Sequence, residues 1–387
     1  MTITLASLEA VPLTASFATI YGGVGNIPEE ISKPASHFQS IPRTGQFCTL
    51  VLARSSDGAT GIGECFGLPT PFASAEVVNR VIAPAIVGHQ ITEPAQMLRE
   101  LNGFFARLGH TKGPSMEAMS GVDIALWDLA ARRAGQPLAV YLGADAVPVP
   151  TYVSPIPFLP SPQQTAERAR SLAQDFSAMK LKIGRTVAED VAFITAVRDA
   201  LPSNVQLMLD ANCAYTLEQA SELLAEIASL DIAWLEEPLA TEDIAGLRYL
   251  AERWKTPLAA GENEFSPAAF RRLASEAGIS ILQPNITRAG GVTGMLAIDA
   301  LAMQQSARVA PHGVGGIVAV ASTLHVAAKM DSFLCFEINR MPNPLRDGLG
   351  PQIKLHQGAG LPPVGNGHGA EITSEAIARF SDTAISP

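Results

Sequence analysis

Alternating hydrophobic and polar positions predict a strand near the middle of the chain, at residues 177–184. Three apolar side chains would share one face and two lysines the other: Met179, Leu181 and Ile183 against Lys180 and Lys182. If the apolar face packs on helices, both ammonium groups point into a sheet or barrel, where burial disfavours a charge without a partner. The alternative is an exposed edge strand with solvated lysines.

From about Val149 onward, apolar runs alternate with helical stretches, and a polar residue ends each run at intervals of 23 to 28 residues. These residues are Lys182, Asp210, Glu236, Glu262, Asn285, His312 and Glu337. With residues 149–154 as the first strand, the repeat predicts eight βα units, which close into a (β/α)8 barrel. Such barrels carry their chemistry at the C-terminal strand ends, so these side chains would face one rim.

The first 148 residues predict strands followed by helices. The strands are expected at residues 3–13, 47–53 and 60–65, and the helices at about 75–87, 94–108 and 115–134. We divide the chain into residues 1–148, a barrel at 149–350 and a tail at 351–387 that packs back on the N-terminal part.

A segment rich in glycine and proline, residues 21–45, separates the first two predicted strands. It is too long for a plain connection, and such loops are typically binding loops or lids, although a disordered surface excursion is an alternative. Lys33, His37 and Arg43 lie in it and are candidates for binding substrate hydroxyls or a second carboxylate.

Composition narrows the function classes. Of 387 residues, 47% are hydrophobic and 17% charged, which is typical of a globular protein. A net charge of −10 without a basic cluster argues against a nucleic-acid partner. The four cysteines are scattered without zinc-site spacing, which favours a reducing compartment. No signal-peptide pattern or run of transmembrane length is found, so we expect a cytoplasmic protein with no membrane partner.

Three carboxylates end successive predicted strands: Asp210, Glu236 and Glu262. Clustered like charges repel unless a cation lies among them, and an all-oxygen set suits Mg2+, with Mn2+ as a substitute. The alternative is that each carboxylate caps a helix. Glu237 neighbours Glu236, so only one of them can face the barrel axis. Asn212 shares the direction of Asp210 and is expected to touch ligand or hold a metal-bound water.

Several motifs together carry a family resemblance. They are Ala118–Leu129, Gly135–Leu138, Leu142-Gly143, Lys180-x-Lys182, Asp210–Asn212, Leu235–Pro238, Gly261–Asn263 and Pro311-His312. With them the chain resembles the enolase superfamily, in its mandelate racemase-like group (the mandelate racemase/muconate lactonizing enzyme family). The resemblance implies an α/β protein: a modified TIM barrel under an α+β capping domain built from the N-terminal part and the C-terminal tail.

The resemblance also implies the chemistry. One Mg2+ would be held by the three carboxylates, and the proton α to a substrate carboxylate would be removed to give a metal-stabilised enediolate. Lys182 would be the base. Its pKa must fall toward neutrality for this role, and the neighbouring Lys180 cation and the metal both lower it.

By the same resemblance, His312 lies on the opposite face of the substrate, where relatives orient it with an aspartate. Here that position is Asn285. An amide can accept the Nδ1–H bond and hold a tautomer, but it cannot stabilise an imidazolium as a carboxylate does. This favours β-elimination over proton transfer between two faces. Glu337 is expected to donate to or orient the substrate carboxylate, with a helix cap as the alternative.

The sequence therefore predicts a Mg2+-dependent lyase, an acid-sugar dehydratase acting on a small hydroxylated carboxylate, assembled as a homo-oligomer. Alternatives within the family are a racemase or epimerase and a sugar-acid lactone cycloisomerase; the segment Asn343–Asp347 is similar to cycloisomerase-like members. From another class, a non-catalytic carboxylate-binding barrel would use Lys182 only as a counter-ion.

Overall fold

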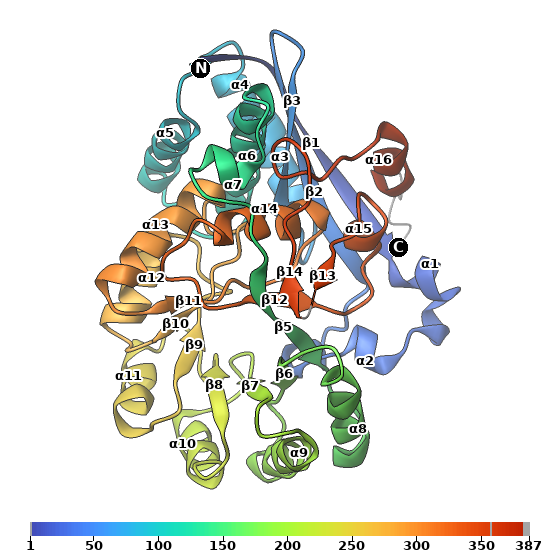
Figure 1. The fold of residues 1–387 in the computed structure, drawn as a ribbon, viewed down its shortest axis with the longest axis vertical. Helices are drawn as coiled ribbons and strands as arrows, with labels where there is room; N and C mark the ends of the chain where they lie inside the picture. Colours follow the sequence, from blue (N-terminus) through green and yellow to red (C-terminus); the bar gives the residue numbers. More distant parts are fainter. Residues whose placement is uncertain (1, 357, 382–387) are drawn as a thin grey trace.

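The computed structural model describes residues 2–356 and 358–381 and consists of an N-terminal sheet with its helices beside a barrel of parallel strands (Figure 1). The antiparallel sheet has the order β3-β2-β1-β4. Its strands are β1 (Ile3–Ser16), β2 (Gly45–Ser55), β3 (Thr60–Phe66) and β4 (Gln90–Ile91). The three long strands begin and end within a few residues of the predicted bounds, so these predictions are confirmed.

Helix α6 (Pro114–Arg133) packs against β3 at close range. A Cβ on Gly61 or Gly63 would lie 2.2 Å and 1.9 Å, respectively, from backbone carbonyl oxygens of this helix. Only glycine permits this approach, which fixes the helix on the sheet.

The predicted helices at 94–108 and 115–134 are confirmed as α5 (Pro94–Arg107) and α6. The predicted helix at 75–87 is instead three short pieces: α3 (Phe72–Val77), a π-helical turn (η3, Val78–Ile82) and α4 (Ala83–Ile86). Pro84 explains the interruption, because it lacks the N–H that would continue the regular hydrogen-bond ladder. A short helix α7 (Leu138–Tyr141) follows α6.

The barrel has eight parallel strands in the described part of the chain, as predicted. They are β5 (Val149–Ile156), β6 (Ala178–Lys182), β7 (Gln206–Asp210), β8 (Ile232–Glu236), β9 (Leu258–Ala260), β10 (Ile281–Leu282), β11 (Arg308–Val309) and β12 (Phe336–Asn339). They pair in sequence order, β12 pairs with β5, and a parallel bridge between Val309 and Phe333 joins β11 to the segment before β12. The ring is therefore closed.

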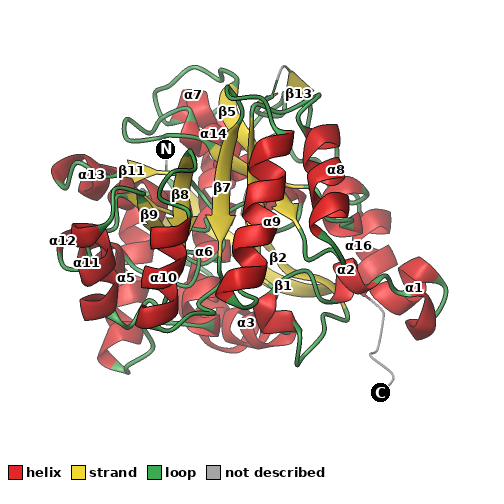
Figure 2. Ribbon diagram, turned by 90° about the horizontal axis from the view of Figure 1, so that it is seen from below, coloured by secondary structure: helices red, strands yellow, loops and turns green. Residues whose placement is uncertain are grey.

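A helix follows each barrel strand. These are α8 (Pro162–Leu172), α9 (Val187–Ala200), α10 (Leu217–Glu226), α11 (Ile244–Arg253), α12 (Pro267–Ser275), α13 (Gly291–Gln304), α14 (Ile317–Ala327) and α15 (Pro344–Asp347). Figure 2 shows α9 and α10 as part of an outer helical layer in front of the strands. Apolar strand residues such as Leu181, Leu209 and Leu235 are fully buried against this layer. None of the described helices is long and apolar enough to cross a membrane.

The tail contacts both parts of the molecule. Strands β13 (Leu355–His356) and β14 (Ala359–Gly360) form a hairpin, and β14 pairs with β5 of the barrel. Further along, Arg132 of α6 pairs with Glu371 at 2.7 Å, and α16 (Ser374–Ser381) packs near β1. Residues 382–387 of the predicted tail lie outside the described part of the chain. The division at residues 148 and 350 stays a prediction.

The segment between β1 and β2 reaches the barrel. It contains α1 (Phe17–Tyr21), α2 (Glu29–Ser32) and the 3-10 turns η1 (Val24–Asn26) and η2 (Ser36–Phe38). The Phe158 N–H donates to the Pro34 carbonyl at 3.1 Å, and Ser36 Oγ donates to the Ala211 carbonyl at 3.3 Å. These bonds hold the segment over the C-terminal ends of β5 and β7.

Candidate active site

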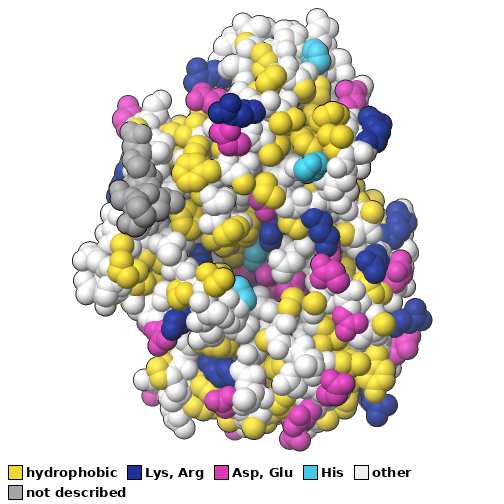
Figure 3. Space-filling model, turned by 180° about the vertical axis from the view of Figure 1, so that it is seen from behind, with side chains coloured by type: hydrophobic (Ala, Val, Ile, Leu, Met, Phe, Trp, Pro, Cys, Tyr) yellow, Lys and Arg dark blue, Asp and Glu magenta, His cyan; other side chains and the backbone are white. Residues whose placement is uncertain are grey.

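A cavity of about 300 Å³ lies where this segment meets the C-terminal ends of the barrel strands. Figure 3 shows acidic, basic and histidine side chains gathered around a hollow near the middle of one face. Barrel residues lining the cavity include Lys182, Asn212, Glu262, His312 and Glu337, and residues from the N-terminal segment include His37, Phe38 and Arg43. The structure therefore brings most of the predicted candidates to one place.

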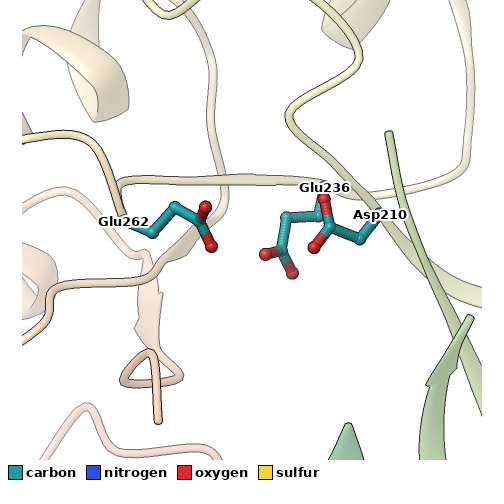
Figure 4. Close-up of side chains that lie close together, drawn as sticks. All are labelled: Asp210, Glu236 and Glu262. Carbon is teal, nitrogen blue, oxygen red and sulfur yellow. The ribbon is translucent and has the colours of Figure 1, made fainter. Parts of the chain in front are cut away.

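Asp210, Glu236 and Glu262 converge, each with a carboxylate oxygen within 4.8 Å of the others (Figure 4). Asp210 pairs with Glu236 in the register of β7 and β8, which sets two carboxylates side by side. Glu262 follows β9 by two residues and points toward them. Its Oε2 is buried and makes no hydrogen bond to a described residue. Convergent carboxylates with a buried oxygen that accepts no hydrogen bond fit a hard cation.

Burial and the charges of neighbouring groups shift the pKa values of the triad carboxyl groups. Burial, and then the charge of Asp210, raise the pKa of Glu236 well above its ordinary value. Burial alone would raise the pKa of Asp210 as well, but the ammonium groups of Lys182 and Lys180 lower it below its ordinary range. Ionisation of both adjacent carboxylates is therefore unfavourable, and a bound cation would reduce the repulsion between them.

Lys180 is a buried counter-ion of the triad. Its Nζ donates to both oxygens of Glu236, at 2.8 Å and 2.9 Å, and lies 3.5 Å from Glu337 Oε1. Burial would lower the pKa of Lys180, but Glu236 and Glu337 raise it well above its ordinary value. Lys180 therefore stays charged and does not line the cavity.

Lys182 ends β6 beside Asp210, to which its Nζ donates, and it also donates to Asn212 Oδ1 at 2.8 Å. Burial, the largest single effect, would lower its pKa, but the carboxylates of Asp210, Glu262 and Glu236 together raise the pKa above its ordinary value. This differs from the lowered value that a base needs, because the carboxylate stabilises the ammonium form. Neutralising Asp210 with a cation would weaken that effect.

The Asn285–His312 contact has the opposite polarity from the one expected. Asn285 Oδ1 accepts from the Thr287 N–H at 2.9 Å and from Thr287 Oγ1 at 2.6 Å. The Asn285 amide nitrogen, in turn, donates to the Val314 carbonyl at 2.8 Å and lies 3.0 Å from His312 Nδ1. Asn285 therefore donates to Nδ1 rather than accepting from it, which places the histidine proton on Nε2.

His312 is thus held as a neutral hydrogen-bond donor. Burial lowers its pKa, although Glu262 and Glu337 act in the other direction. Its Nε2 faces the triad, 3.1 Å from Glu262 Oε2. A neutral imidazole with its proton on Nε2 can donate to a substrate oxygen, but it cannot accept a carbon-bound proton at that atom.

Glu337 lies at the floor of the cavity on β12. Its Oε2 accepts from the Gly313 N–H at 2.9 Å, in the loop after β11 and not at a helix start. Burial would raise the pKa of Glu337, but other effects, above all the charge of the Lys180 ammonium, lower it to about 2. It is therefore an anion that is already partnered by Lys180 and a backbone N–H.

Of the three candidates from the N-terminal segment, two line the cavity and one does not. His37 and Arg43 line the cavity, and burial, followed by the charge of Lys182, lowers the pKa of His37. Lys33 is not among the lining residues. Its Nζ pairs with Glu29 Oε1 at 3.0 Å, one turn earlier in α2. In an irregular segment, neighbouring positions do not share a direction, so sequence alone does not separate these three residues.

Sequence reasoning missed two amides that hold Glu236, at the end of β8, and Glu237, the next residue. Gln283 Nε2 donates to Glu236 Oε2 at 2.6 Å, and Asn263 Nδ2 donates to Glu237 Oε2 at 3.0 Å. Gln283 stands two positions before Asn285, so period-2 alternation at the end of β10 could have found it. Glu237 is not part of the triad and instead accepts from Asn263 and Cys213.

Comparisons with known proteins agree with this geometry. Residues 164–376 match the family model described as "Enolase C-terminal domain-like". Residues 32–143 match that of the mandelate racemase/muconate lactonizing enzyme N-terminal domain.

Two curated relatives align over most of the chain. L-talarate/galactarate dehydratase from Salmonella typhimurium is 31% identical over 84% of this chain and 80% of its own length. D-galactarolactone cycloisomerase from Agrobacterium fabrum is 29% identical over 86% of this chain and 90% of its own length.

Solved structures share the fold. One from Bordetella bronchiseptica RB50, complexed with 2-oxoglutarate/phosphate, is 30% identical and covers 98% of both chains, with a TM-score of 0.86. The family-model matches and these likenesses agree with the barrel, the cap and the motifs. The chain is an enzyme of the enolase superfamily and belongs to its mandelate racemase-like group.

Proposed function

We propose that this enzyme is a Mg2+-dependent acid-sugar dehydratase that removes the proton α to a substrate carboxylate. The observation that carries the proposal is the asymmetry across the cavity. Lys182 lies at one side beside the carboxylate triad, whereas His312 at the other side carries its proton on Nε2. A single base suits elimination, and proton transfer between two faces needs two.

Asp210, Glu236 and Glu262 would hold the cation, since an all-oxygen set suits Mg2+ and also admits Mn2+. When bound, the cation supplies charge stabilisation for the developing enediolate. Lys180 would balance the charge of Glu236, and Asn212 would hold Lys182 in place through its 2.8 Å hydrogen bond.

The proposed proton path uses one residue. Neutral Lys182 takes the α-proton at Nζ, and the electron pair of the C–H bond moves toward the carboxylate. When the bond from the β-carbon to its hydroxyl breaks, the Lys182 ammonium returns the proton and water leaves. His312 Nε2–H donates a hydrogen bond to a substrate oxygen without losing its proton. The enol product then becomes a 2-keto acid.

The substrate class is supported by the relatives, which are a talarate/galactarate dehydratase and a galactarolactone cycloisomerase. A sugar-acid lactone cycloisomerase remains the second candidate, because it needs the same α-proton chemistry and one relative carries that activity. The segment Asn343–Asp347 does not decide between them. Asn343 caps α15 by accepting from the Leu345 N–H at 3.0 Å, which is a structural role.

The test is a screen of acid sugars, diacids and their lactones with Mg2+, followed by proton NMR, with Lys182→Ala in parallel and Lys33→Ala as a matched control. We expect loss of an α-proton and a 2-keto product with wild type and Lys33→Ala only. Ring opening or closure without a keto product would favour the cycloisomerase. Substrate binding without any change in the spectrum would identify a carboxylate-binding barrel.

A further inference from the structure

Arg43 is a cation on the wall of the cavity with no acidic partner. It follows α2 and η2 and lines the cavity as part of the N-terminal segment. Among the described residues, no carboxylate lies within ion-pair distance of its guanidinium. The other long cationic side chains of the lining are paired, Lys182 with Asp210 and Arg288 with Glu117.

The guanidinium is held in place but is not saturated. Its Nη2 donates to Gln46 Oε1 at 2.7 Å, and Gln46 is itself fixed by donating to the Pro342 carbonyl at 2.8 Å. Nε is buried without a hydrogen-bond partner, and Nη1 makes no hydrogen bond to a described residue but is not buried. One exposed donor group of this cavity-lining residue therefore has no partner among the described residues.

Its surroundings make an unpaired charge costly. The guanidinium packs against the rings of Phe17 and Phe38, 5.8 Å and 5.5 Å from their centroids. Burial lowers the pKa of Arg43 to about 10, which leaves it charged at neutral pH. Aromatic faces compensate part of this cost, but a charge with unsatisfied donors is better stabilised by an anion.

We propose that Arg43 binds a second carboxylate of the substrate, so that the enzyme prefers dicarboxylic acid sugars to monocarboxylic ones. This inference rests on the proposed function, which places the first carboxylate at the triad. The cation that the triad would hold and the Arg43 guanidinium then lie on different parts of the protein, the first at the ends of barrel strands and the second on the N-terminal segment. A ligand with an anion at each end bridges them.

The test compares two ligands that differ only in the distal carboxylate, 2-oxoglutarate and 2-oxopentanoate. Calorimetry with the Mg2+-loaded protein measures their affinities without turnover. We expect wild type to bind 2-oxoglutarate about 10- to 100-fold more tightly, the effect of a hydrogen-bonded charge pair. Arg43→Met should abolish this preference and leave 2-oxopentanoate unchanged, and Arg43→Lys should keep part of it. Lys33→Met, the control, should change neither affinity.

Equal Mg2+-dependent binding of both ligands by wild type would overturn the inference and leave the proposed function intact. An equal loss of both ligands in Arg43→Met would overturn it too, since Arg43 would then only support the fold of the wall. If neither ligand bound wild type in a Mg2+-dependent way, the carboxylate site itself would be wrong, and the proposed function would fail with it.

Discussion

The two sides of the cavity hold their proton-carrying residues in different ways. Lys182 is charged and donates to a carboxylate and an amide oxygen, Asp210 and Asn212. His312 is neutral and is fixed by an amide that donates to it. A change at Asp210, such as cation binding, alters the acidity of Lys182 directly. The proton on His312, by contrast, is set by Asn285, which is itself held by Thr287 and Val314.

A racemase needs one base on each face of its substrate, and Lys182 and His312 are not equivalent in this respect. In the proposed reaction the lysine side exchanges a proton, whereas the histidine side only donates a hydrogen bond. Under the proposed function the barrel rim carries out elimination with one base, and one side chain, Asn285 in place of an acid, makes the distinction. The predictions below change one side at a time.

The largest effect is expected from Lys182→Ala. Removing the base should lower the rate of α-proton loss by at least ~10²–10⁴-fold, the usual contribution of a positioned base. Proton NMR of the reaction in deuterated water measures this. Mg2+ affinity should change far less, and a variant that lost Mg2+ and activity together would indicate a structural role for Lys182.

Glu262→Gln should weaken Mg2+ binding by at least the ~10–100-fold that loss of an outer-shell partner costs. Calorimetric titration with Mg2+ alone measures this. The matched control is Glu264→Gln, because Glu264 is near in sequence but pairs with Lys112 at 3.3 Å instead of joining the triad. Equal weakening in both variants would argue against a specific triad.

The sequence predicts the fold and the carboxylate triad, but not every contact in the cavity. The barrel, its eight strands and the converging carboxylates follow from a regular repeat that ends apolar runs in polar residues, and the structure confirms the barrel and the convergence. The polarity of the Asn285–His312 bond does not follow, because it depends on which groups already bind the amide. Lys33 and Arg43 likewise differ only through side-chain direction in an irregular segment, where no periodicity applies.

Asn285→Asp should change the role of His312 on the histidine side of the cavity. A carboxylate would accept from Nδ1–H and stabilise the imidazolium, which frees Nε2 to act as a base. We expect a few per cent or more of the substrate to appear inverted at the α-carbon, seen by NMR or chiral chromatography. Asn285→Ala, which removes the amide without adding a charge, should give none. Inversion in both variants would show that the amide does not control His312.

The smallest effect concerns Glu64 on β3, whose side chain accepts hydrogen bonds from the start of α14. Its Oε2 accepts from the Ala319 N–H at 3.0 Å, and burial raises its pKa to about 7. The folded state therefore holds a proton that the unfolded state has lost between about pH 4.5 and 7, so stability falls as pH rises through this window. Denaturant unfolding should show wild type losing free energy of unfolding relative to Glu64→Gln there. A difference independent of pH would contradict the raised pKa.

The central claim, one base and one fixed donor, is tested most directly by the stereochemical course in deuterated water. Wild type is incubated with Mg2+ and an accepted acid sugar, and the remaining substrate is recovered at partial conversion. The account predicts a 2-keto product and recovered substrate with its original configuration at the α-carbon, whether or not it carries deuterium. Recovered substrate that is inverted and deuterated at this carbon would show His312 acting as a second base and would contradict the account.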